Sequence, residues 1–191
     1  MMAKIATRAV LTLLICATGY ADGVSWGPAT LSDNNGGAFL SGFSIFTSGT
    51  TWILNLPNFS QSDFASFSGE VSLSVSADDV FPGIVGVMFE YSGTIDQTFG
   101  PASVQYLQTA SGSPDQSGDF TTTPFSGFFA RSASNHIDLT TTIDLSDFGG
   151  SAGINRIEFN LATVPEPSSL PSVIMLTAGL GLAWRIRRRK K

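Results

Sequence analysis

The chain contains a single histidine, His136, so chemistry that depends on an imidazole has one candidate. A zinc site built on one histidine, without a second histidine or a cysteine, has too few of the usual ligands. A nucleophile–base triad also needs a histidine or a substitute for it. We interpret His136 as an ordinary exposed or hydrogen-bonded side chain. The sequence therefore predicts no catalytic residue and no metal ligand.

Paired carboxylates are the remaining groups that could catalyse a reaction. Three pairs stand near one another in the sequence: Asp78 with Asp79, Asp144 with Asp147, and Glu90 with Asp96. A glycosidase holds its two acids about 5–9.5 Å apart across a sugar. Neighbouring strand residues point to opposite faces, so Asp78 and Asp79 would cooperate only in a turn. We expect solvated turn and strand residues here and a protein that is not an enzyme, with a secreted glycan hydrolase as the less favoured alternative.

Aromatic side chains beside Asp or Asn groups can stack on sugar rings. Trp26 and Trp52 are the candidate ligand-binding residues, and Tyr91 and Tyr106 offer further rings of the same kind. Aromatic rings in a β-sandwich also pack in its core. A carbohydrate-binding surface and core packing both stay open at the level of sequence.

Oxygen-rich turns make calcium the alternative to having no cofactor. Asp33, Asn34 and Asn35 form one polar turn, and Asp78 with Asp79 forms another. Hard oxygen ligands suit Ca²⁺, but neither turn has the ligand spacing of an EF-hand loop. Turn stabilisation by the same side chains is the competing interpretation.

The elements that would position these residues are strands, because apolar and polar residues alternate with a period of two. The buried sides expected of three strands are Val71, Leu73, Val75 and Ala77; Ile137, Leu139, Thr141, Ile143 and Leu145; and Ile157, Phe159 and Leu161. Arg156, Glu158 and Asn160 lie on the wet side of the third strand. Such strands have one buried and one solvated face.

Further strands are predicted over about 37–47, 50–56, 84–95, 102–109 and 124–133. Turn residues separate them: Asn34-Asn35-Gly36-Gly37, Pro82-Gly83, Ser113-Pro114-Asp115 and Gly149-Gly150. This spacing predicts a mainly β protein, an antiparallel β-sandwich of the jelly-roll or immunoglobulin-like kind, over residues 22–163. All 15 phenylalanines lie in this region, so we expect a Phe-rich core.

Charge is divided sharply along the chain. From Asp22 to Glu158 there are 14 acidic residues, and Arg131 and Arg156 are the only strong bases in that stretch. An acidic domain repels phosphate backbones, so no nucleic-acid partner is expected. The other bases flank two apolar runs, which is the pattern of a membrane topology.

The first apolar run has the features of a signal peptide over residues 1–21. Lys4 and Arg8 precede it, and Gly19-Tyr20-Ala21 is a small-x-small site, so signal peptidase is expected to cut between Ala21 and Asp22. The run is too short to cross a membrane as an anchor. Cys16, the only cysteine, lies in this run, so the mature protein is expected to have no disulfide.

The second apolar run follows a proline-rich junction. Pro165, Glu166 and Pro167 interrupt regular structure, and residues 168–184 are apolar enough for a short transmembrane helix. Six bases follow as the tail 185–191, expected on the cytoplasmic side: Arg185, Arg187, Arg188, Arg189, Lys190 and Lys191.

This arrangement over residues 164–191 resembles the PEP-CTERM sorting signal. The resemblance implies a Gram-negative bacterium whose inner-membrane exosortase recognises Pro165, Glu166 and Pro167. It further implies that the helix anchors the protein transiently in the inner membrane before the protein passes to the cell surface or extracellular matrix. Such proteins occur alongside exopolysaccharide production. The resemblance predicts a non-enzymatic structural or interaction role associated with exopolysaccharide, with a carbohydrate-binding module as the alternative.

Overall fold

The structure is a computed structural model that describes residues 23–62, 68–79 and 83–164. Strands account for the regular structure of these ranges, and no helix in them is long and apolar enough to span a membrane. The strands are β1 (Val24–Trp26), β2 (Thr30–Asp33), β3 (Ser44–Ser48), β4 (Thr51–Asn55), β5 (Ser60–Ser62), β6 (Gly69–Asp79), β7 (Ile84–Asp96), β8 (Ala102–Ala110), β9 (Gln116–Phe120), β10 (Phe125–Ser134), β11 (His136–Asp147) and β12 (Ser151–Thr163).

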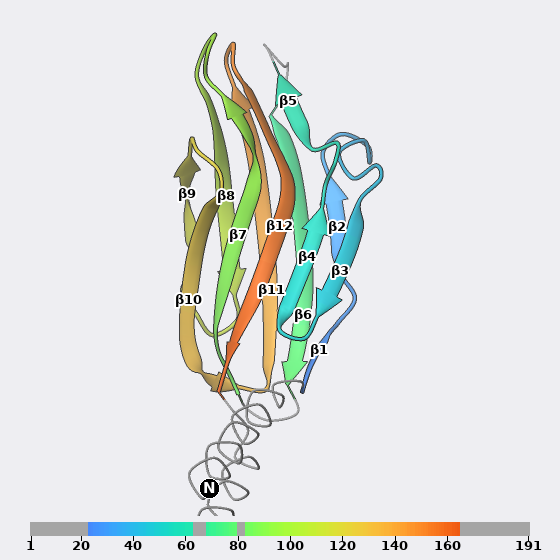
Figure 1. Ribbon diagram of the computed structural model, residues 1–191, viewed down its shortest axis with the longest axis vertical. Coiled ribbons are helices and arrows are strands. Elements are labelled where there is room, and N and C mark those ends of the chain that lie inside the picture. The colour runs from blue at the N-terminus through green and yellow to red at the C-terminus, as the bar shows by residue number, and fades with distance from the viewer. Residues whose placement is uncertain (1–22, 63–67, 80–82, 165–191) are drawn as a thin grey trace, which may run out of the picture. The chain divides into compact units, whose positions relative to one another are not determined.

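The strands form two antiparallel sheets in a sandwich (Figure 1). Sheet A has the order β1-β6-β11-β8-β9, and β2 also pairs with β6. Sheet B has the order β10-β7-β12-β4-β3, and β5 also pairs with β12. The predicted mainly β, antiparallel sandwich is therefore confirmed.

The pairing of the later strands is nested. β8 pairs with β9, β7 with β10, β6 with β11, and β5 with β12. From β5 to β8 and again from β9 to β12, the chain changes sheet at every step. Each sheet is consequently assembled from segments that are far apart in the sequence, so the residues that share a face cannot be read from one segment.

The predicted alternation holds along the long strands. Val71, Leu73, Val75 and Ala77 of β6 are all buried, and so is the matching series on β11. Thr141, placed on the buried side by its position, has its hydroxyl hydrogen-bonded to the buried side-chain oxygen of Gln108. The hydroxyl of Tyr91 donates to the same oxygen at 2.9 Å, so these buried polar groups satisfy one another.

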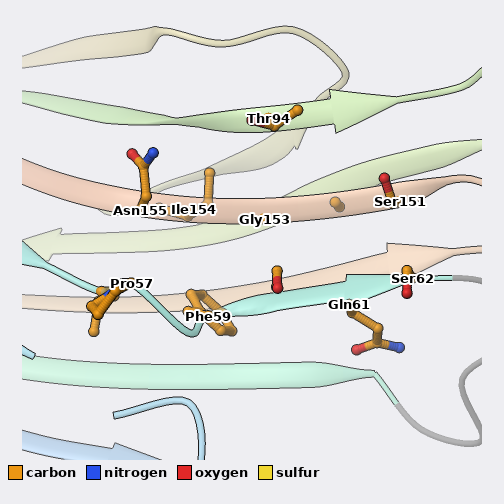
Figure 2. Close-up of a pocket in the computed structure, with 12 residues that line it drawn as sticks. Pro57, Phe59, Gln61, Ser62, Thr94, Ser151, Gly153, Ile154 and Asn155 are labelled. Atoms are coloured by element: carbon orange, nitrogen blue, oxygen red, sulfur yellow. The ribbon is translucent and has the colours of Figure 1, made fainter. Parts of the chain in front are cut away.

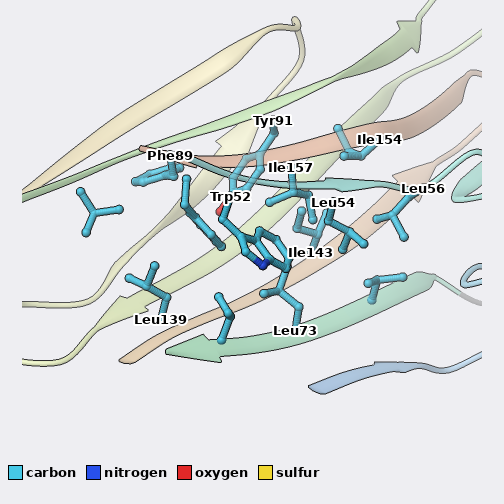
Figure 3. Close-up of a cluster of buried hydrophobic side chains, with 14 of the residues drawn as sticks. Trp52, Leu54, Leu56, Leu73, Phe89, Tyr91, Leu139, Ile143, Ile154 and Ile157 are labelled. Atoms are coloured by element: carbon cyan, nitrogen blue, oxygen red, sulfur yellow. The ribbon is translucent and has the colours of Figure 1, made fainter. Parts of the chain in front are cut away.

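The core lies between the two sheets (Figure 3). Trp52 and Phe159 stack with ring centroids 5.6 Å apart, and Phe89 packs against Tyr91 at 5.3 Å. Each fully buried ring of this size contributes about 1.5–3 kcal/mol relative to exposure. The expected Phe-rich core is found only in part, because Phe43, Phe46, Phe99, Phe128 and Phe148 are exposed.

The strand predicted over 37–47 begins only at Ser44, so its first half is a correction. Asp33 explains the difference: its carboxylate accepts the backbone N–H groups of Asn35 at 3.1 Å, Gly37 at 2.7 Å and Leu40 at 3.2 Å. These bonds hold the segment in successive turns, and Gly37 adopts a φ of 90°, which a strand does not use.

Four strands were not predicted: β1, β2, β5 and β9. Each has three to five residues, and sequences such as SQS and QSGDF contain too few apolar residues to show a period of two. They are strands because a long neighbour supplies the hydrogen-bond ladder. Tertiary pairing, rather than local pattern, decides short strands of this kind.

The predictions for the two ends fall outside the described residues. These are the signal peptide with its cleavage site, the Pro-Glu-Pro junction, the helix at 168–184 and the basic tail at 185–191.

Candidate functional site

The outward-facing surface of sheet B combines aromatic rings with a hydrogen-bonded polar network. The strand registers place its residues in three rows: Phe46-Ile53-Glu158-Glu90-Ser126, Ser48-Thr51-Asn160-Met88-Phe128, and Ser44-Asn55-Arg156-Ser92. Their neighbours along each strand, such as Trp52, Phe89 and Phe159, point into the core. We call this surface the outer face of sheet B.

Glu158 is the centre of the network. Asn160 Nδ2 donates to Glu158 Oε1 at 2.7 Å, and Arg156 donates to Oε2. The hydroxyl of Thr51 in turn donates to Asn160 Oδ1 at 2.6 Å. A chain of bonds across β4 and β12 therefore fixes the Glu158 carboxylate in one orientation.

The Glu158 side chain is only 18% exposed, yet its charged form is favoured. Partial burial raises its pKa, but the hydrogen bonds from Asn160 and Arg156 and the positive charge of Arg156 outweigh burial. The pKa of Glu158 therefore lies below its ordinary value, and the carboxyl stays ionised at neutral pH.

Glu90 lies directly opposite Glu158 on β7. Its Oε1 accepts a hydrogen bond from the Ser92 hydroxyl at 3.1 Å. Among the described residues, no hydrogen bond reaches its Oε2, so one carboxylate oxygen of this half-buried residue is an open acceptor.

Two phenylalanine rings lie on either side of these carboxylates, in the edge strands β3 and β10. Phe46 is 57% exposed and Phe128 is 52% exposed. A Cβ added to Gly86 would lie 2.4 Å from Phe128 Cζ, so the ring rests over the glycine on the neighbouring strand. The absence of a side chain at Gly86 thus lets the Phe128 ring lie close to the sheet.

Two adjoining hollows continue from the network toward β5. One, of about 640 Å³, is lined by Arg156 and Asn55, and the other, of about 340 Å³, by Ser60, Thr94 and Ser151. They share Pro57 and Asn155. Figure 2 shows the second hollow, with lining residues on β7, on β12 and on the segment that enters β5.

The tryptophans singled out from the sequence lie elsewhere. Trp52 is 1% exposed and packs in the core, where its ring presents no face to a ligand. Trp26 is partly buried, and its indole N–H donates to the Gly49 carbonyl at 3.0 Å. Tyr91 is fully buried and Tyr106 packs against the core.

The carboxylate pairs noted in the sequence are not brought together as acid pairs. Asp144 and Asp147 lie three residues apart on β11 and so face opposite ways, and Asp147 accepts a bond from Gln61. Glu90 and Asp96 lie six residues apart on β7, so their positions along the strand are separated by about 20 Å. That separation is too large for a glycosidase pair.

His136 lies between two aspartates on the outward-facing surface of sheet A. Its Nδ1 is 2.7 Å from Asp78 Oδ1, and its Nε2 is 3.1 Å from Asp138 Oδ1. The hydrogen bond with Asp78, followed by that with Asp138, raises the pKa of His136 above its ordinary value. The imidazole therefore acts as a hydrogen-bonded surface group between two carboxylates.

The oxygens proposed for calcium are already used at the Asp33 turn. The second proposed turn is wrong, because Asp78 and Asp79 lie in strand β6 and pair with β1 and β11. Both carboxylate oxygens of Asp33 accept backbone N–H groups, which lowers the pKa of Asp33 despite the opposing effect of burial. Asn34 bridges to Ser68 and Glu70. Among the described residues, no group of three or more His, Cys, Asp or Glu side chains is arranged to hold a metal ion.

Sequence reasoning placed Arg156, Glu158 and Asn160 on a solvated strand face but assigned them no role. It also missed Phe46 and Phe128, which it expected in the core. The alternation along β10 could have signalled Phe128, because Phe129 takes the buried position next to it. The pairing of Glu158 with Glu90 had no signal in the sequence, since 68 positions separate them and only the fold makes them neighbours.

Residues 163–189 match the family model described as the PEP-CTERM protein-sorting motif. The chain carries a PEP-CTERM sorting motif. The resemblance seen in the sequence is confirmed over that stretch, which includes Pro165, Glu166 and Pro167. The PEP-CTERM motif implies an exported protein that passes through a membrane-anchored stage and has an exosortase as its processing partner.

Solved structures with a similar course of the chain share little sequence with this protein. One is the carbohydrate-binding module TmCBM61 in complex with β-1,4-galactotriose. It is 12% identical in sequence, and the match covers 78% of this chain and 92% of that chain with a TM-score of 0.32. Another is the adhesin domain of Epf from Streptococcus pyogenes. It is 11% identical, and the match covers 76% of this chain and 59% of that chain with a TM-score of 0.34. A third is the Gap123 complex from Streptococcus agalactiae. It is 8% identical, and the match covers 78% of this chain and 28% of that chain with a TM-score of 0.36. No curated protein matches the chain.

Proposed function

We propose that this is an exosortase-sorted protein of the cell surface or extracellular matrix whose β-sandwich binds a glycan chain on the outer face of sheet B. The observation that carries the binding role is the pair of exposed rings, Phe46 and Phe128, on either side of fixed polar groups. Flat apolar rings and well-placed hydrogen-bonding groups are what sugar rings need from a binding surface. This makes a carbohydrate-binding role the preferred form of the interaction function.

The same geometry favours binding over hydrolysis. A glycosidase needs one carboxyl that stays protonated as a general acid and a second that is free to attack or to activate water. In Glu158 both oxygens are engaged by Asn160 and Arg156, and its pKa is lowered rather than raised. We therefore assign Glu90 and Glu158 to binding.

We also propose that the sandwich is a jelly roll rather than an immunoglobulin-like fold. The support is the nested pairing of β5 to β12, which winds one long antiparallel hairpin across both sheets. A constant-type immunoglobulin sandwich has seven strands arranged as ABED and CFG.

The binding proposal is tested by affinity electrophoresis of the full-length protein, purified in detergent, in gels that contain purified exopolysaccharide. Phe46→Ala and Phe128→Ala should each weaken retention about two- to tenfold, since an aromatic contact contributes about 0.5–1.5 kcal/mol. Leu107→Ala is the matched control, because Leu107 is 44% exposed on the outward-facing surface of sheet A. Equal loss of retention in all three variants would contradict the proposal.

The sorting proposal keeps the signal peptide at 1–21, cut between Ala21 and Asp22, the helix at 168–184 and the cytoplasmic tail at 185–191. Replacing Pro165, Glu166 and Pro167 by alanine should leave export intact and hold the protein in the inner membrane. Moving the basic tail through the bilayer would cost at least about 2.5 kcal/mol per Arg or Lys at its centre. Cell fractionation should show a longer, membrane-bound form of the variant, and identical size and location of the two proteins would contradict this assignment.

A further inference from the structure

We propose that the outer face of sheet B selects uncharged glycan chains and rejects polyuronates, the polysaccharides that carry a carboxylate on each sugar. This inference rests on the glycan-binding function proposed above and names the chemical class of its ligand. It is carried by the distribution of charge and of open hydrogen-bonding atoms on that face.

Three side chains of charged residue types occur on the rows that make up the face: Glu90, Glu158 and Arg156. Arg156 donates to Glu158 and neutralises it. Among the described residues no cation pairs with Glu90, so the face carries one uncompensated negative charge at its centre. Because Glu90 is half-buried, solvent screens that charge less than it would screen a fully exposed one.

The atoms left open on the face point to the same ligand. The Oε2 atom of Glu90 accepts hydrogen bonds and cannot donate them. A sugar hydroxyl supplies the donor that this oxygen needs, and a charge-assisted bond of this kind is stronger than one between neutral groups. A uronate would instead place a carboxylate, also an acceptor, against Glu90, so charge and hydrogen bonding would both oppose binding.

The distance between the two rings implies a chain rather than a single sugar. Phe46 on β3 and Phe128 on β10 are separated by four strand spacings, which is about 19 Å. A ligand that touches both rings therefore has to run across the strands and pass over Glu158 and Glu90. A polyuronate in that position would bring carboxylates as well as hydroxyls past Glu90, whereas an uncharged chain would bring no negative charge.

The experiment measures retention of the full-length protein, purified in detergent, in affinity gels at low and high salt. The probes are a neutral β-glucan, its oligosaccharides from disaccharide to hexasaccharide, and alginate as the polyuronate. The variants are Glu90→Gln and, as a matched removal of one negative charge from the other sheet, Asp144→Asn. We expect the neutral glucan to retain the protein and alginate not to retain it. Binding of the glucan oligosaccharides should become stronger as their length increases.

Glu90→Gln should weaken glucan binding about fivefold, because it converts a charge-assisted bond to a neutral one. It should also permit measurable retention by alginate, while Asp144→Asn should leave both results unchanged. Alginate binding by the wild-type protein that equals or exceeds glucan binding would overturn the inference and leave the glycan-binding function in place. Equal gains in alginate retention from the two variants would assign the selectivity to overall charge and overturn it as well. Retention by neither polysaccharide would instead overturn the proposed function, and the inference with it.

Discussion

Each sheet places two acidic residues directly opposite one another on its outward-facing surface, and the two pairs have different surroundings. On sheet B, Glu158 lies opposite Glu90 and is held by Arg156 and Asn160. On sheet A, Asp144 lies opposite Glu70, and among the described residues neither carboxylate has a hydrogen-bonded or ionic partner. Like charges directly opposite are destabilising unless a third group compensates them.

The rest of each surface follows the same division. Sheet A presents mostly serine, threonine and acidic side chains, such as Ser72, Thr140 and Thr142, and the hydroxyls of Ser72 and Thr142 hydrogen-bond across the strands at 3.1 Å. Sheet B presents two exposed phenylalanine rings and the domain's one arginine–carboxylate pair among the described residues. Exposed aromatic rings and a partly buried, hydrogen-bonded polar network therefore occur together on the face that we propose binds a glycan, whereas Asp144 and Glu70 lie opposite one another on sheet A without such a network.

The largest expected effect comes from Gly86, beneath the Phe128 ring. In Gly86→Ala the new Cβ would lie 2.4 Å from Phe128 Cζ and 2.7 Å from the Phe129 carbonyl oxygen, and the latter belongs to the backbone of the paired strand. We expect the free energy of unfolding to fall by about 3 kcal/mol, the cost of overpacking. Urea denaturation of the full-length protein in detergent measures it.

Gly118→Ala on β9 of sheet A is the control for this substitution. Its Cβ would meet Tyr106 Cε1 at 3.5 Å, an ordinary contact, so the free energy of unfolding should stay within about 0.5 kcal/mol of wild type. Similar destabilisation by the two substitutions would contradict this prediction, because the loss of stability at Gly86 would then not depend on its close contact with the Phe128 ring.

A somewhat smaller effect is expected from Glu158→Ala, which removes the acceptor of Arg156 and Asn160. The free energy of unfolding should fall by about 2 kcal/mol, because partly buried donors lose their partner. Asp144→Asn on sheet A should change it by no more than about 0.5 kcal/mol, toward greater stability, because it relieves the repulsion with Glu70. If both variants were equally destabilised in urea, the contrast between the two acid pairs would be lost.

Acid should weaken the network on sheet B. The pKa of Glu158 is lowered in the folded protein, so its contribution is present above the unfolded-state value of about 4.3 and is lost as pH falls through the lower folded-state value. Between about pH 5 and pH 2, wild type should lose more stability than Glu158→Gln, which has no such carboxyl to protonate. Denaturation curves that fall in parallel would refute this linkage.

The smallest expected effect concerns His136 on sheet A. Its raised pKa means that its contribution to stability is present below about pH 6.5 and is lost as pH rises through the higher folded-state value. The pair with Asp78 is exposed, so this contribution is small. Asp78→Asn should lower the pKa of His136 as measured by NMR titration, and an unchanged pKa would contradict the role of the Asp78 carboxylate.

Local sequence patterns were enough to predict the class of the fold and the long strands. Alternation with a period of two marks β6, β11 and β12 because each has one face against the core and one against water. The sorting motif could also be predicted from the sequence, because it is one contiguous stretch defined by the order of its prolines, its apolar run and its bases along the chain.

The short strands and the outer face of sheet B depend on contacts between segments that are distant in the sequence, and the turns before β3 depend on hydrogen bonds to the Asp33 side chain. Short strands such as β5 and β9 exist because a long neighbour offers a ladder, and the turns over 37–43 exist because Asp33 captures three backbone amides. The outer face of sheet B joins Phe46, Glu90, Phe128 and Glu158 from four strands. The alternation of apolar and polar residues along a strand predicts only which side chains point outward. Strand order and register decide which outward side chains meet, and pairing between distant segments sets both.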